Sequence, residues 1–71
     1  MKTLQYYYEK DLGWMIEILD DNLLSIYKCC YYTLLKKDKQ TILKLVDNLS
    51  LKFNINKERI FYGKITNIEN N

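Results

Sequence analysis

Residues 38–53 read DKQTILKLVDNLSLKF, and their apolar positions predict an amphipathic helix. These positions recur at the three- and four-residue spacing that gathers side chains on one helical face. They are Ile42, Leu45, Val46, Leu49 and Phe53. Asp38 is placed to cap the N-terminus, and Lys52 suits the negative C-terminal end. We therefore expect a helix from Lys39 to about Phe53, with Leu51 exposed on its polar side.

The residues at the start of the chain predict a β-hairpin. Residues 3–9 contain three consecutive tyrosines, and rows of aromatic side chains favour strands. Trp14, Ile16 and Ile18 occupy alternate positions, as in a strand with one well-buried face. Residues 10–13 lie between these two segments and end in a glycine, which suits the positive φ of a short hairpin loop.

Residues 23–35 are ambiguous. Their aromatic and β-branched side chains favour a third strand. Several apolar positions in the same segment also fall at helical spacing, and Asp21 could cap such a helix. We expect a strand here and keep a helix as the alternative.

Residues 59–65 alternate and predict a final strand, in which Gly63 marks a bulge or a close backbone approach. The expected fold class is α+β, with a small antiparallel sheet packed by one amphipathic helix. A hairpin plus two helices is the alternative. This fold occupies residues 1–66 as a single small domain, and the polar tail, residues 67–71, is expected to fray. Ile60 and Tyr62 are expected to join Trp14, Ile16 and Ile18 in the core, together with Ile65.

The composition excludes several classes of protein. A chain of 71 residues that is 48% hydrophobic and 28% charged is not intrinsically disordered. Charges interrupt every apolar run, so we expect no membrane span and a cytoplasmic location. Histidine is absent, which excludes Ser–His and Cys–His nucleophiles and histidine-based zinc sites within one chain. Adjacent Cys29 and Cys30 are expected to be free thiols, because a bridge between neighbours is strained. We expect no catalytic residue, no metal ligand and no cofactor.

The residue usage indicates an AT-rich gene. Lys, Asn, Ile, Tyr, Phe and Met fill 36 of the 71 positions, whereas Gly, Ala, Arg and Pro fill three. Low-GC bacteria and their phages and plasmids are natural sources of such genes.

The seven tyrosines and one tryptophan exceed what one small core can bury. Tyr and Trp are also the residues that dominate hot spots in protein interfaces. The candidate partner-binding residues are Tyr6, Tyr8, Tyr31 and Tyr32. We expect a non-enzymatic protein–protein interaction module that occupies a surface of a larger protein, with a homodimer as a further option. A phage or mobile-element inhibitor of a host protein, of the anti-CRISPR kind, is one concrete form.

The alternative function is that of a small nucleic-acid-binding regulator using a basic helix face. The second half of the chain holds most of the basic residues, and lysines can neutralise phosphates. The candidate contacts are Lys36, Lys37, Lys44, Lys57 and Arg59. Arginine makes most base-specific contacts, and this chain has only one, so we favour a protein partner.

Overall fold

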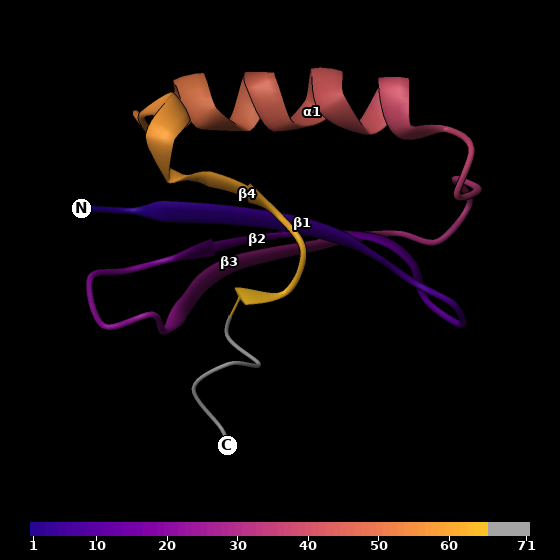
Figure 1. Ribbon diagram of the computed structural model, residues 1–71, viewed down its shortest axis with the longest axis horizontal. Coiled ribbons are helices and arrows are strands. Elements are labelled where there is room, and N and C mark those ends of the chain that lie inside the picture. Colours follow the sequence, from indigo (N-terminus) through magenta and orange to yellow (C-terminus); the bar gives the residue numbers. More distant parts are fainter. Residues whose placement is uncertain (66–71) are drawn as a thin grey trace.

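The computed structural model describes residues 1–65, which form a four-stranded sheet with one helix across one face (Figure 1). The elements are β1 (Thr3–Glu9), β2 (Gly13–Leu19), β3 (Ser25–Tyr31), α1 (Lys39–Lys52) and β4 (Ile60–Tyr62). The strands lie side by side in the order β3-β2-β1-β4. The α+β prediction is confirmed, and so is the third strand. The predicted fraying of residues 67–71 lies outside the described residues.

The β1–β2 hairpin closes at Gly13. Glu9 pairs with Gly13 across the antiparallel ladder, and Gly13 has a φ of +90°. A Cβ atom there would lie 2.7 Å from the carbonyl oxygen of Tyr31 and 2.7 Å from the Cα of Tyr32. Glycine is therefore required at position 13 for two reasons: the backbone has positive φ, and β3 passes too close for a side chain.

The turn that precedes β3 favours a strand over a helix, because its backbone N–H groups are hydrogen-bonded in a way that a helix would not allow. The Asp20 carboxylate accepts hydrogen bonds from the N–H groups of Asn22 and Leu24, at 2.9 and 3.0 Å. Leu23 between them has a φ of 63°, which no helix contains. β3 then pairs antiparallel with β2, with Tyr31 opposite Trp14. The alternative helix in residues 23–35, capped by Asp21, is wrong for this reason.

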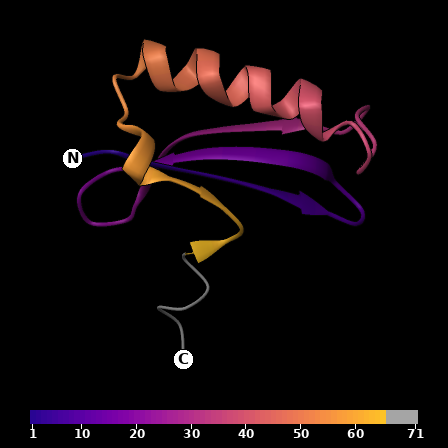
Figure 2. The same ribbon diagram turned by 45° about the horizontal axis from the view of Figure 1, so that its top comes forward.

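β4 pairs with β1 in parallel, so the sheet is mixed and not wholly antiparallel as expected. The cause is the helical crossover: α1 carries the chain from the end of β3 back over the sheet, so β4 runs in the same direction as β3 and β1 (Figure 2). β4 is also shorter than predicted at both ends. Arg59 belongs to a 3₁₀ turn, Lys57–Arg59, and the positive φ of Gly63 ends the strand after Tyr62.

Gly63 ends β4 with a φ of +120°, and its N–H donates to the Tyr6 carbonyl at 2.8 Å. Among the described residues, no heavy atom lies within 4 Å of the position of a Cβ at Gly63. The expected close backbone approach is therefore wrong. Glycine is favoured at position 63 only because the backbone there has positive φ.

The predicted helix is confirmed as α1, and its apolar stripe faces the sheet. Ile42 and Val46 are fully buried, whereas Leu51 is 81% exposed. Asp38 precedes the helix but does not cap it with its side chain. Its φ and ψ of −85° and 31° are not those of a typical N-cap, and its carboxylate accepts the N–H of Leu35 at 2.8 Å instead.

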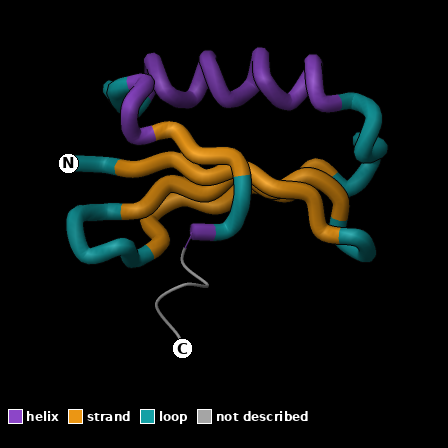
Figure 3. The backbone as a smooth tube through the Cα atoms, viewed as in Figure 1, coloured by secondary structure: helices purple, strands orange, loops and turns teal. Residues whose placement is uncertain are grey.

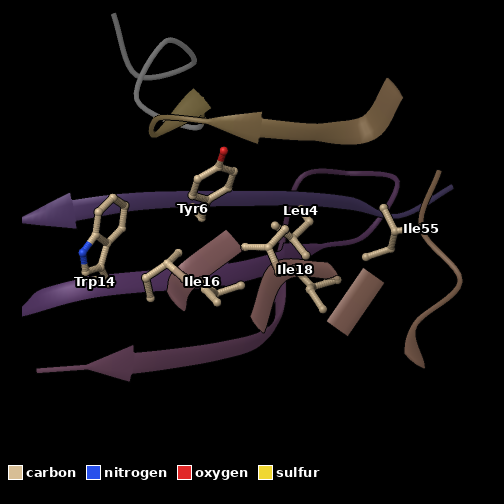
Figure 4. Packing of buried hydrophobic residues seen from close by; sticks show 8 residues of the cluster. Leu4, Tyr6, Trp14, Ile16, Ile18 and Ile55 are labelled. Carbon is tan, nitrogen blue, oxygen red and sulfur yellow. The ribbon is translucent and has the colours of Figure 1, made fainter. Parts of the chain in front are cut away.

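The core lies between α1 and the sheet (Figure 4). Its buried members are Leu4, Tyr6, Trp14, Ile16, Ile18, Ile42, Val46 and Ile55. The indole N–H of Trp14 donates to the Leu35 carbonyl at 2.8 Å, which ties the loop before α1 to the sheet. Ile60 packs against this core as expected, but Tyr62 is 55% exposed. The prediction that Tyr62 is a core residue is wrong, because β4 is an edge strand and Tyr62 is its last residue.

The opposite face of the sheet is not an open surface. Figure 3 shows the chain after β4 turning to the side of the sheet away from α1. There the N–H of Ile65 donates to Gln5 Oε1 at 2.8 Å, and Gln5 Nε2 donates to Glu17 Oε1 at 2.8 Å. Lys64 pairs with Glu9 at 3.3 Å. These contacts leave neither face of β1 free as a broad binding platform.

Candidate functional site

Four aromatic side chains gather where β1, β2 and β4 lie side by side. We call this group the aromatic corner; it consists of Tyr6, Tyr8, Trp14 and Tyr62. The ring centroids of Tyr8 and Trp14 are 5.6 Å apart, and those of Tyr6 and Tyr62 are 5.3 Å apart. Trp14 lies 6.3 Å from Tyr62 and 6.5 Å from Tyr6. All four separations fall within the range of favourable aromatic pairs.

Strand alternation and register bring these rings together. Successive side chains of a strand point to opposite faces, so Tyr6 and Tyr8 share the face beneath α1 and Tyr7 lies on the other face. Tyr8 is opposite Trp14 in the β1–β2 ladder, and Tyr6 is opposite Tyr62 in the β1–β4 ladder. The corner is therefore assembled from three strands.

Exposure rises from the inside of the corner to its rim. Trp14 and Tyr6 are buried, Tyr8 is half-buried and Tyr62 is exposed. Burial, and then the neighbouring Tyr62 and Asp47, raise the pKa of the Tyr6 hydroxyl. Lys39, the first residue of α1, places its Nζ 4.0 Å from the centre of the Tyr62 ring. The exposed Tyr62 ring therefore contacts Lys39 through a cation–π interaction and packs against Tyr6 and Trp14.

The other two predicted tyrosines lie at the end of β3. Tyr31 is opposite Trp14, half-buried on the face beneath α1. A side-chain hydrogen bond with Cys29, with burial, raises the pKa of Tyr31 to about 12. Tyr32 follows the strand and is 79% exposed. The structure thus gathers Tyr6, Tyr8 and Tyr31 around Trp14 and leaves Tyr32 apart.

Sequence analysis missed Tyr62 as a binding candidate. Its alternation with Ile60 is typical of a strand with one buried face, and this assigned both residues to the core. The signal that distinguishes them is the short length of the strand, because the final residue of a three-residue edge strand lies at the rim of the core.

The five basic candidates do not form one patch. Lys36 and Lys37 lie in the turn before α1, and Lys57 and Arg59 lie beyond its other end. The helix between them is about 20 Å long. Lys44 is exposed on the helix itself. Arg59 is half-buried, and its guanidinium donates to Thr3 Oγ1 at 2.5 Å, so it serves the packing of β1 against the 3₁₀ turn.

Residues 1–65 contain no pocket and no cluster of three His, Cys, Asp or Glu side chains that could hold a metal ion. Cys29 is half-buried, and the exposed Cys30 thiol donates to the Leu12 carbonyl at 2.9 Å. No helix in this described part of the chain has the length and apolar character needed to cross a membrane.

Comparison with protein-family models, with curated proteins and with solved structures finds no match to this chain. The case for a site therefore depends on geometry. The feature with the most specific geometry is the aromatic corner with its exposed Tyr62.

Proposed function

We propose that this chain is a non-enzymatic protein–protein interaction module that binds a larger protein through the aromatic corner. The observation that supports this is Tyr62, which is 55% exposed yet held by Tyr6, Trp14 and Lys39. Binding normally requires the ordering of flexible side chains, which opposes association. A tyrosine that is already ordered avoids much of this loss, and tyrosine is among the residues enriched in hot spots.

The chemistry of the corner indicates the kind of surface that would bind it. The exposed Tyr62 ring suits a small apolar pocket, and the Lys39 ammonium beside it suits a carboxylate at the pocket rim. A chain of this size would act stoichiometrically, by covering that surface. Inhibition of a host protein by a phage or mobile element, as in anti-CRISPR proteins, is the concrete form that we propose for this activity.

Affinity capture from a lysate of the native host tests the proposal. Three baits are compared: the wild-type chain, Tyr62→Ala, and Leu51→Ala as a control at an exposed apolar residue on α1. We expect Tyr62→Ala to weaken binding by about 2 kcal/mol or more, roughly thirtyfold, so that the captured protein is lost. Leu51→Ala should retain it.

Two outcomes would contradict the proposal. If Tyr62→Ala captures the same protein as the wild type does, the aromatic corner is not the binding site, and a Tyr32→Ala bait then tests the remaining exposed tyrosine. If nuclease treatment removes every captured protein, the bait binds nucleic acid. In that case the regulator hypothesis replaces this one, and its candidate contacts are Lys36, Lys37, Lys44, Lys57 and Arg59.

A further inference from the structure

β3 is an edge strand of the sheet, and it is long for an edge strand that nothing covers. It has seven residues, and among residues 1–65 no strand pairs with its outer side. Lys28 is its single charged residue, and it contains no proline. Leu24, Ile26 and Tyr32 expose apolar surface at its two ends. Natural edge strands are usually shortened, charged or covered, because their free N–H and C=O groups pair with other strands.

We infer that a second copy of this chain pairs with β3, edge to edge and antiparallel, about a two-fold axis. The charges at the two ends of β3 indicate this occupant. The acidic pair Asp20 and Asp21 precedes the strand, and the basic pair Lys36 and Lys37 follows it. Antiparallel pairing places the acidic end of each copy beside the basic end of the other, whereas parallel pairing would place like charges together.

These charges are accessible at the surface. The Asp21 side chain is 72% exposed, although it pairs with the N-terminal ammonium of its own chain. Asp20 is half-buried in the turn before the strand, where its carboxylate accepts two backbone N–H groups. Lys36 and Lys37 are both exposed. Since both ends of the interface carry the same complementary pairing, the surface is self-complementary, as an isologous dimer requires.

The strand sequence disfavours the register with Lys28 on the axis, and we infer the neighbouring register with Cys29 on the axis. A two-fold axis perpendicular to the sheet places one residue of β3 opposite its own copy. An axis at Lys28 would set two ammonium groups opposite each other, which destabilises a ladder. An axis at Cys29 removes this repulsion and sets Lys28 opposite Cys30. In this register, the Cys29 side chains of the two copies are directly opposed, with Cβ atoms about 5 Å apart.

The mass of the protein in solution tests the inference. Under reducing conditions, sedimentation over a concentration series should show a species of twice the 8.6 kDa chain mass. Ile26→Lys adds a charge at the β3 edge and should raise the dissociation constant at least tenfold. The control, Leu51→Lys, adds the same charge to the exposed side of α1 and should leave it unchanged. Circular dichroism melts should show that both variants remain folded.

A wild-type chain that is monomeric at every concentration would overturn the inference, and so would equal dissociation constants for the two variants. Reversing the basic end with Lys36→Glu and Lys37→Glu should weaken the dimer, and adding Asp21→Lys should restore it. Absence of that rescue would refute the antiparallel arrangement. After addition of an oxidant, Cys30→Ser should cross-link through Cys29 faster than Cys29→Ser does through Cys30; the reverse order would refute the register.

This interface is independent of the proposed function. β3 and β4 are opposite edges of the sheet, so the aromatic corner and the β3 edge lie on different sides of the molecule. Tyr62→Ala should therefore leave the dimer mass unchanged. Failure of the capture experiment would not affect the sedimentation result.

Discussion

Substitution of Gly13 by alanine adds one methyl group, and it should destabilise the fold more than the same substitution at Gly63 does. The added Cβ would lie 2.7 Å from the Tyr31 oxygen and 2.7 Å from the Tyr32 Cα. Both are backbone atoms of a paired strand region, so neither can rotate away as a side chain would. The positive φ of Gly13 adds a second penalty, because alanine rarely adopts it.

A comparison with Gly63 separates the cost of positive φ from the cost of the close contact. Backbone strain at positive φ costs about 1–3 kcal/mol, and forcing extra atoms into a packed site costs about 1–3 kcal/mol more. Gly13→Ala should therefore lower the free energy of unfolding by roughly 2–6 kcal/mol. Gly63 also has positive φ but nothing within 4 Å among the described residues, so Gly63→Ala should show only the first penalty.

Urea denaturation of the two variants and the wild type measures both values. A domain of this size has a total stability of about 4–10 kcal/mol, so Gly13→Ala should be marginally folded or unfolded, whereas Gly63→Ala should keep a cooperative transition. If Gly13→Ala is as stable as Gly63→Ala, then β3 does not approach the hairpin as closely as described. That result would refute the close contact between Gly13 and the end of β3.

Two further predictions concern the core and the opposite face of the sheet. Ile42→Ala should reduce the free energy of unfolding by about 2–5 kcal/mol, while Leu51→Ala should change it by less than about 0.5 kcal/mol, as measured by urea denaturation. Burial, and then the neighbouring Glu17, raise the pKa of Tyr7 from 10 to about 12. The folded state therefore holds this proton more tightly, and stability should fall as the pH rises from 10 to about 12. Denaturation midpoints across that range should decline less steeply for Tyr7→Phe, and an equal decline would refute the assignment.

The elements that sequence predicts best are those whose pattern does not depend on distant contacts. The helix after Asp38 and the hairpin around Gly13 each have a local signature, in apolar periodicity or in turn chemistry. Residues 23–35 carry both a strand and a helix pattern, and only the Asp20 turn and the pairing with β2 decide between them. The parallel direction of β4 follows from the crossover of α1, which no residue in β4 itself encodes.

The candidate site could also be predicted only in part, because only some of its features follow from local patterns. Alternation predicts that Tyr6 and Tyr8 share a face, and the register of the sheet agrees. Alternation does not indicate which face the helix covers, and three of the four predicted partner-binding tyrosines, Tyr6, Tyr8 and Tyr31, lie in or against the core beneath α1. Tyr62 reaches the same group only through the long-range β1–β4 pairing. Whether these residues bind a partner stays a prediction.

The β1–β4 pairing also has a consequence for the order of folding. β1 is synthesised well before its parallel neighbour, which comes near residue 60, after the helix. Closing so long a loop costs about 2 kcal/mol more in chain entropy than closing the hairpin, so this pairing should form late. Until β4 docks, the buried strand β1 has an uncovered edge, which is a template for association between nascent chains. The three-residue strand β4, Ile60–Tyr62, therefore completes the sheet and also covers the edge of β1 through which nascent chains could associate.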